Sequence, residues 1–175
     1  MCRHQVPWGR ALRFQVPRLS RVGPQAQALA VSNRILIVED DPADVATLHA
    51  FLEDEASLIR AETDSRRAEQ AIAEFDPDLV LLDLRMPEPG GMEILRRIRG
   101  VREVAGFLPV IVLTGDDSDV ARNSALALGA DDFLGKPLDR QEVVLRVRNL
   151  LRTRRLYVEL TETNKALKRK LGRSD

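Results

Sequence analysis

Five polar residues follow four short apolar segments of the chain and could together form a reactive site. They are Glu39, Asp40, Asp83, Thr114 and Lys136. The apolar segments read as buried strands of a parallel sheet, and ligands of such sheets bind beyond the carboxyl ends of the strands. We therefore expect the five side chains to meet at one rim. Three carboxylates, a hydroxyl and an ammonium suit a hard cation together with a phosphoryl group.

The chain around these residues alternates strand and helix patterns, which is typical of repeated βα units. The patterns predict strands near 34–39, 57–62, 79–83, 109–114 and 132–136, and helices near 42–54, 65–74, 91–100, 118–128 and 140–151. Right-handed crossovers then give a doubly wound α/β fold with a five-stranded parallel sheet and five helices. In the flavodoxin-like order 2-1-3-4-5, the crevice lies between the strands that end at Glu39 and at Asp83.

Other acidic residues are assigned to helix starts. Asp41 stands before Pro42, and proline is favoured at the first helical position, so we interpret Asp41 as a helix cap rather than a metal ligand. Asp44 falls in the first turn of the same helix. Asp139 and Glu142 have the spacing of a capping-box variant at the start of the last helix.

A second acidic pair, Asp131 and Asp132, is as good a candidate for the acidic site as Glu39 and Asp40 when each pair is taken alone. It precedes a strand instead of following one. We therefore place it at the opposite rim of the sheet and interpret it as turn chemistry.

The acidic cluster predicted at the rim needs a cation. Carboxylates packed together repel one another and stay ionised only beside a positive charge. Magnesium is the natural candidate, because it prefers oxygen ligands and is held by one or two carboxylates together with phosphate oxygens. A zinc site is not expected, since Cys2 and His4 lie in the leading segment and His49 lies in the middle of a helix.

Charge divides the chain into three parts, although its 27 basic and 27 acidic residues cancel overall. Residues 1–33 are basic, free of acids and without a regular hydrophobic period, so we expect a disordered extension. Their composition suits a transit peptide, a nucleic-acid-binding arm or a tail without a role. Residues 34–151 are acidic and form the predicted domain. Residues 152–175 are basic again, with a helical pattern.

Cellular location is predicted from cysteine content and hydropathy. The single cysteine, Cys2, excludes an internal disulfide framework and fits a reducing compartment. Apolar runs in the chain are shorter than the roughly 20 residues that a membrane-spanning helix needs. We expect a soluble, cytoplasmic protein without a membrane partner.

Four segments, ILIVEDD, LVLLDLRMP, VIVLTG and DDFLGKP, resemble the receiver domains of bacterial two-component response regulators in both order and spacing. The resemblance covers about residues 34–151. It implies that Asp83 accepts a phosphoryl group from a sensor histidine kinase or a phosphotransfer protein. It also implies a magnesium site made by Glu39, Asp40, Asp83 and the backbone carbonyl of Arg85.

The resemblance further implies a switch. Lys136 matches the lysine that binds the phosphoryl group, Thr114 the switch hydroxyl and Phe133 the aromatic switch position. The Thr114 hydroxyl reaches a phosphoryl oxygen only when the following loop moves inward, which opens space for Phe133 to rotate. Phosphorylation then biases an existing two-state equilibrium, and the expected output face spans 118–151.

The helical pattern continues beyond Leu151. Leu156, Leu160, Thr163 and Leu167 repeat at intervals of four, three and four, which traces a short coiled-coil seam. An unbroken helix over 140–171 would be roughly 48 Å long at ~1.5 Å per residue. We expect it to pair with a second protomer or to lead into a downstream signalling domain; a frayed, solvated tail is the alternative.

The favoured function is a phosphorylation-switched regulator that acts through a downstream effector protein or a homodimer. The chain modifies itself and is not expected to be a turnover enzyme. DNA is not an expected partner, because only 24 residues follow Leu151, too few for a helix-turn-helix domain. The alternatives are a transcription regulator, a scaffold that works without phosphorylation, and the receiver portion of a longer signalling enzyme.

Overall fold

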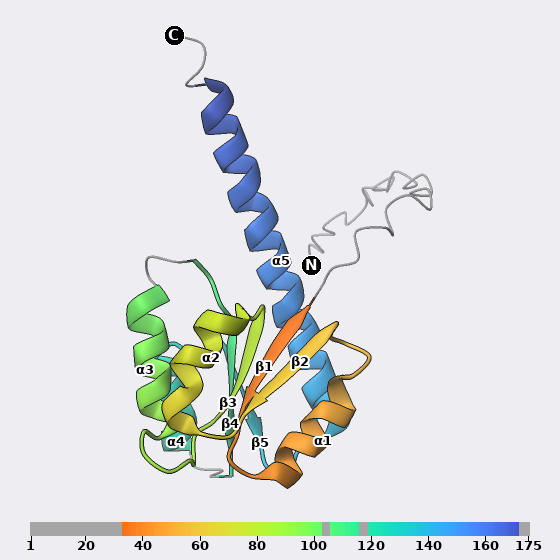
Figure 1. Ribbon diagram of the computed structural model, residues 1–175, viewed down its shortest axis with the longest axis vertical. Helices are drawn as coiled ribbons and strands as arrows, with labels where there is room; N and C mark the ends of the chain where they lie inside the picture. The colour runs from red at the N-terminus through yellow and green to blue at the C-terminus, as the bar shows by residue number, and fades with distance from the viewer. Residues whose placement is uncertain (1–32, 103–105, 116–118, 172–175) are drawn as a thin grey trace, which may run out of the picture. The chain divides into compact units, whose positions relative to one another are not determined.

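A five-stranded parallel sheet forms the centre of the computed structural model, which describes residues 33–102, 106–115 and 119–171 (Figure 1). The strands are β1 (Arg34–Val38), β2 (Leu58–Glu62), β3 (Leu79–Asp83), β4 (Val110–Thr114) and β5 (Asp132–Gly135). Their order in the sheet is β2-β1-β3-β4-β5, and all four neighbouring pairs are parallel. The predicted flavodoxin-like sheet is confirmed. Apart from Asn33, the predicted basic extension 1–33 lies outside the described residues.

Each predicted helix is present. The helices are α1 (Pro42–Leu52), α2 (Ala68–Phe75), α3 (Gly91–Arg102), α4 (Asp119–Ala127) and α5 (Arg140–Leu171). The helix predicted from residue 65 begins differently, with a 3₁₀ turn, η2 (Ser65–Arg67), ahead of α2. The Asp64 side chain accepts a hydrogen bond from the Arg66 amide at 3.0 Å, which holds this tighter turn.

The helices divide the apolar residues of the sheet between two layers. In β1, Leu36 and Val38 pack with residues of α2 and α3, whereas Ile35 and Ile37 pack with residues of α1 and α5. Both faces of β1, β3 and β4 are covered, and for this reason these strands read as continuous apolar runs rather than as an alternating pattern. The two layers leave the carboxyl ends of the strands uncovered.

Capping residues fix the helix starts nearest to that rim. The Asp41 carboxylate accepts a hydrogen bond from the Ala43 amide at 2.8 Å, as the predicted cap requires. The Asp139 carboxylate accepts one from the Glu142 amide at 2.9 Å. Both predicted caps are therefore confirmed, and α1 begins three residues after the acid that ends the β1 segment.

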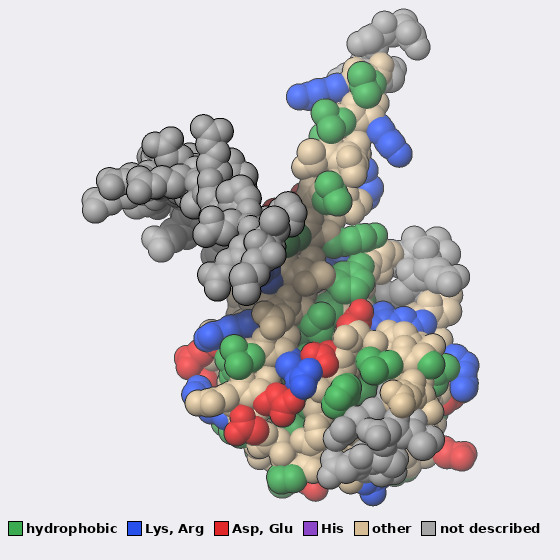
Figure 2. All heavy atoms as spheres, turned by 180° about the vertical axis from the view of Figure 1, so that it is seen from behind, with side chains coloured by type: hydrophobic (Ala, Val, Ile, Leu, Met, Phe, Trp, Pro, Cys, Tyr) green, Lys and Arg blue, Asp and Glu red, His purple; other side chains and the backbone are tan. Residues whose placement is uncertain are grey.

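Helix α5 continues without a break for 32 residues and extends beyond the sheet (Figure 1). Its first half buries Val143, Val147 and Leu151 against the sheet. Its second half leaves four leucines at least half exposed: Leu156, Leu160, Leu167 and Leu171. Figure 2 shows hydrophobic and basic side chains along this projecting part. No helix in the described part of the chain has the length and apolar character that a membrane span would need.

Candidate functional site

The register of the sheet brings the predicted residues to one rim. Val38 pairs with Leu82, so Glu39 and Asp83 follow on neighbouring central strands. Thr114 ends β4 and pairs with Gly135 of β5, and the Lys136 amide donates a hydrogen bond to the Thr114 carbonyl at 2.8 Å. The chain thus delivers acids, alcohol and amine to the same edge from four separate strands.

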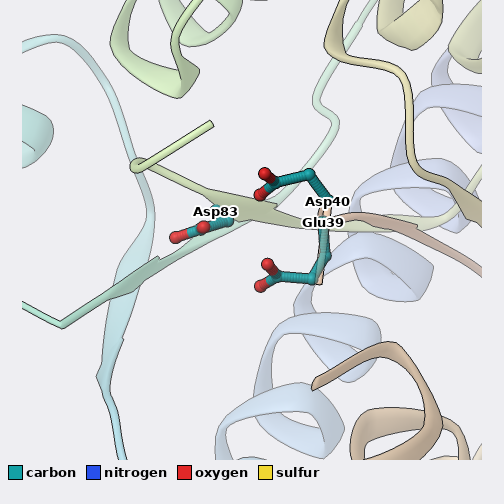
Figure 3. Close-up of side chains that lie close together, drawn as sticks. All are labelled: Glu39, Asp40 and Asp83. Atoms are coloured by element: carbon teal, nitrogen blue, oxygen red, sulfur yellow. The ribbon is translucent and has the colours of Figure 1, made fainter. Parts of the chain in front are cut away.

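Three carboxylates form a cluster at this edge. Oxygen atoms of Glu39, Asp40 and Asp83 lie within 4.8 Å of one another, and their side chains point to the same side (Figure 3). Glu39 and Asp83 are buried, with exposed fractions of 0% and 3%, whereas Asp40 is exposed. One exposed and two buried oxygen donors suit an ion that keeps several of its water ligands, as magnesium does.

A hollow of about 670 Å³ opens above the cluster. It is lined by Glu39, Asp40, Asp41, Asp44, Asp83, Arg85, Gly115, Lys136 and Pro137. The Oδ1 atom of Asp83 is buried and has no hydrogen-bond partner among the described residues. A buried carboxylate oxygen without a partner is costly, so its position favours a bound ligand. The donor set therefore fits a hard divalent cation.

Lys136 contributes a positive charge that contacts the acids of the site directly. Its Nζ lies 2.8 Å from Glu39 Oε2, 2.7 Å from Asp44 Oδ2 and 3.5 Å from Asp83 Oδ2. Burial lowers the pKa of Lys136, but hydrogen bonds with Asp44 and Glu39 outweigh burial and raise this pKa above its usual value. The ammonium is therefore charged at neutral pH.

Opposing effects act on the pKa of Glu39. Burial raises its pKa, the hydrogen bond from Lys136 lowers it, and the negative charge of Asp83 raises it. The net effect is a pKa above the usual value for a glutamate. Burial together with Asp83 thus outweighs the contact with Lys136, and a divalent cation would stabilise the ionised form of Glu39.

The sequence placed Asp44 in the first turn of α1 and gave it no part in the site. The structure brings its carboxylate into contact with Lys136. The available signal was its position four residues after Asp40, one helical turn from the end of the β1 segment. Sequence spacing alone does not show that the long Lys136 side chain would cross to this turn.

Gly91 is a second feature that the sequence analysis did not use. A Cβ atom at this position would lie 2.0 Å from the backbone oxygen of Asp83 and 2.8 Å from the Leu84 Cα. Glycine is therefore required where α3 starts against the end of β3. This close approach fixes the backbone on which Asp83 is carried.

The remaining predicted residues are Thr114 and Arg85 at the rim and Phe133 within β5. Thr114 is buried, with an exposed fraction of 1%. Phe133 is partly buried against the core layer of α2 and α3, and the Arg146 guanidinium carbon lies 5.3 Å from its ring centroid. The Arg85 side chain lines the hollow beside Gly115. The roles assigned to these residues, including metal binding by the Arg85 carbonyl, stay predictions.

The family model for the response regulator receiver domain matches residues 35–148, which is more than half of the chain. The chain belongs to the response regulator receiver family. Its fold and its acidic cluster fit this assignment, since receiver domains bind magnesium in an acidic pocket. Receiver domains are generally not turnover enzymes.

Individual relatives agree with the family. The transcriptional regulatory protein TrcR of Mycobacterium tuberculosis is 37% identical over 145 residues, covering 81% of this chain and 52% of TrcR. The BeF3-activated N-terminal receiver domain of Klebsiella pneumoniae RstA has 36% identity and a TM-score of 0.62, with 69% of this chain and 99% of that chain covered. The receiver domain of a DNA binding response regulator from Colwellia psychrerythraea has 31% identity and a TM-score of 0.63, covering 69% and 99%.

The relatives bear on one expectation in particular. The chain spans about half the length of the curated relatives it matches. Some of these relatives are named transcriptional regulators, and one structural neighbour is named a DNA binding response regulator. The expectation that DNA is not a partner therefore gains no support from the comparisons.

Proposed function

We propose that the chain is a phosphorylation-controlled signalling domain that accepts a phosphoryl group on Asp83 from a sensor histidine kinase or a phosphotransfer protein. The observation that carries this proposal is the Asp83 carboxylate. It is buried in the acidic hollow, its Oδ1 has no hydrogen-bond partner in the described part of the chain, and its Oδ2 lies 3.5 Å from the Lys136 ammonium. Neither Asp131 nor Asp132, at the other rim, has such surroundings.

The transfer step follows from these groups. A carboxylate oxygen of Asp83 attacks phosphorus, an acyl phosphate bond forms, and the bond to the donor's histidine nitrogen breaks with its electrons leaving on that nitrogen. Lys136 offers its charge to the phosphoryl oxygens. Glu39, Asp40, Asp83 and the Arg85 carbonyl would hold magnesium, and the ion would supply positive charge that offsets the negative charges of the site. Attack of water on phosphorus later breaks the bond between phosphorus and the Asp83 oxygen, which releases inorganic phosphate and restores the carboxylate.

Thr114 and Phe133 are proposed to convert this step into a conformational change. Thr114 ends β4 and lies at the same rim as Asp83, which supports contact between its hydroxyl and a phosphoryl oxygen. Phe133 lies on the adjacent strand β5, opposite Val112. An inward shift at Thr114 would therefore be transmitted to the β4–β5 edge of the sheet, which α4 and α5 cover on opposite faces.

The test is phosphoryl transfer to the purified full chain. Incubation with magnesium and acetyl phosphate should add one acid-stable, alkali-labile phosphoryl group, detected by intact mass. Asp83→Asn should abolish it, because the amide is not a nucleophile toward phosphorus. Asp132→Asn, at the opposite rim, is the matched control and should be labelled like the wild type. Labelling of Asp83→Asn at the wild-type level would disprove the assignment.

The proposed output uses the second half of α5. Arg154 donates a hydrogen bond to the Phe107 carbonyl, and the rings of Tyr157 and Phe107 lie 5.7 Å apart. These contacts tie the helix to the segment that leads into β4, the strand that ends at Thr114. We propose that 34–151 form the receiver unit and that 152–175 extend it to a second protomer or an effector protein.

The exposed leucines of this extension make a prediction about self-association. Removing residues 152–175 should raise the dissociation constant of the dimer by at least about tenfold, because burial of one leucine alone contributes ~1.5 kcal/mol or more. Analytical ultracentrifugation of the two forms measures this. Leu160→Ser should act in the same direction, whereas Glu162→Ser should not. Equal sedimentation of full-length and shortened chains would contradict the prediction.

DNA-linked output is the second candidate, favoured by the names of the transcriptional regulators that resemble this chain. In that case the chain would be the receiver part of a longer regulator, since it spans about half of such relatives. The mass of the native protein distinguishes this candidate from output through α5 alone.

A further inference from the structure

Among the described residues, Asp44 makes the shortest contact with the Lys136 ammonium. The distance from Lys136 Nζ to Asp44 Oδ2 is 2.7 Å, compared with 3.5 Å to Asp83 Oδ2. A second short contact, at 2.8 Å, joins Lys136 to Glu39. A lysine ammonium has three donors, and two of them are therefore directed at acids other than Asp83. The ammonium is held to the α1 side of the hollow.

We propose that Asp44 is a positioning residue that restrains Lys136 on the α1 side and thereby limits how far Asp83 is phosphorylated. The inference rests on the proposed function of Asp83, and it concerns the regulation of that same site. The phosphoryl group, once on Asp83, needs the Lys136 ammonium as a partner. Asp44 competes for this ammonium in the unphosphorylated state.

Electrostatics gives the direction of the effect. A phosphoryl group is an anion, and Asp44 adds a negative charge to the hollow that must accept it. Removing that charge both releases Lys136 and reduces repulsion of the phosphoryl oxygens. The side chains of Asp44 and Lys136 are 31% and 22% exposed, so water screens the pair and the effect is moderate.

A purely structural role for Asp44 predicts something different. An acidic residue in the first turn of a helix stabilises that helix through the dipole. Loss of this contribution would lower the stability of α1, but it would not increase the affinity of the site for a phosphoryl group. The affinity for a phosphoryl analogue therefore separates the two roles.

Asp41 provides a matched control. It lines the same hollow, belongs to the same helix start and carries the same charge. Its carboxylate caps α1 through the Ala43 amide, and asparagine caps helices equally well. Asp41→Asn thus removes one negative charge from the hollow without removing a partner of Lys136.

The experiment measures beryllofluoride binding to the full chain at saturating magnesium, by calorimetry, for wild type, Asp44→Asn, Asp44→Glu and Asp41→Asn. We expect Asp44→Asn to bind on the order of threefold more tightly, as loss of a partly exposed ion pair predicts, and Asp41→Asn to tighten binding by less, because it leaves the contacts of Lys136 in place. Asp44→Glu should return affinity toward the wild-type value, because it restores a carboxylate. Labelling by acetyl phosphate should likewise be higher for Asp44→Asn than for the wild type, and Asp44→Glu should be close to the wild type.

Three results would overturn the inference. Unchanged binding by Asp44→Asn would show that the contact does not restrain Lys136. Weaker binding would show that Asp44 assists the site instead. Equal tightening by Asp44→Asn and Asp41→Asn would assign the effect to net charge. In each of these cases a wild-type chain that is still labelled on Asp83 leaves the proposed function intact, whereas an unlabelled wild type would refute that function itself.

Discussion

The two rims of the sheet carry similar acids in different surroundings. At the amino end, Asp131 lies 2.6 Å from Arg99, and Asp132 lies 2.5 Å from Arg146. These two acids contact different arginines, although Arg146 also pairs with Glu142. At the carboxyl end, Glu39, Asp44 and Asp83 converge on the single ammonium of Lys136. Asp40 joins this cluster and adds a further charge.

The difference indicates what each rim does. Acids with their own arginines are already compensated, so they hold the chain together and need no ligand. Acids that share one cation keep an uncompensated negative charge, which favours a bound divalent ion. The contrast therefore lies in the balance of partners, because acid pairs of the same kind occur at both rims.

The largest expected effect tests this contrast directly. Asp40→Asn should weaken magnesium binding on the order of 10- to 100-fold, because it removes an oxygen donor of the cluster. Asp132→Asn should leave magnesium affinity unchanged, since that carboxylate is already paired. Isothermal titration with magnesium chloride measures both variants. Equal losses in the two variants would remove the distinction between the rims.

The next effect concerns stability and involves the amino-end rim. Arg99 donates hydrogen bonds to Asp131 and to the carbonyls of Gly129 and Leu108, at 2.6 to 2.8 Å. Arg99→Ala should lower the free energy of unfolding by about 2–3 kcal/mol, because it leaves a half-buried carboxylate and two carbonyls without this donor. Urea unfolding measures it, while magnesium affinity should stay unchanged.

Arg97→Ala is the matched control for Arg99→Ala. On the protein surface, Arg97 pairs with Glu93 of α3 and with Glu69 of α2. Such pairs contribute little, so the loss should be below about 1 kcal/mol. If the two arginine variants were equally stable, the amino-end rim could not be called a structural clamp.

Some contacts behind this contrast between the rims could be predicted from the sequence, and others could not. Strand direction was readable from the apolar runs, and it placed Asp83 and Asp131 at opposite rims. The Asp41 cap was also readable, because it depends on residues two positions apart. The contact of Asp44 with Lys136 was not, since 92 residues separate them and a flexible lysine can reach several partners.

Two further features were not predicted, one of them local and the other dependent on backbone packing. The 3₁₀ start before α2 follows from a cap at Asp64, a local contact like that of Asp41, but the hydrophobic period alone predicted a regular helix from residue 65. Gly91 is required by the approach of α3 to the backbone of Asp83. The sequence shows the glycine, but only the fold shows the atom that a side chain would meet.

The smallest expected effect uses pH to compare the rims in metal-free protein. Because burial above all raises the pKa of Glu39, folded chains take up its proton at higher pH than unfolded chains do. Relative to Glu39→Gln, wild-type stability should therefore rise as the pH falls from 7 toward about 4.5, the ordinary pKa of glutamate. This contribution is fully present below that value and is lost as the pH rises through the raised pKa.

Asp132→Asn should lower the stability of the protein at neutral pH, because it removes a carboxylate that pairs with Arg146. Thermal unfolding in the presence of a chelator, from pH 7 to pH 4.5, measures both differences. A flat difference between wild type and Glu39→Gln would mean that the contact with Lys136 fully offsets the effect of burial on the pKa of Glu39. The ionised form of Glu39 would then need no divalent ion to stabilise it.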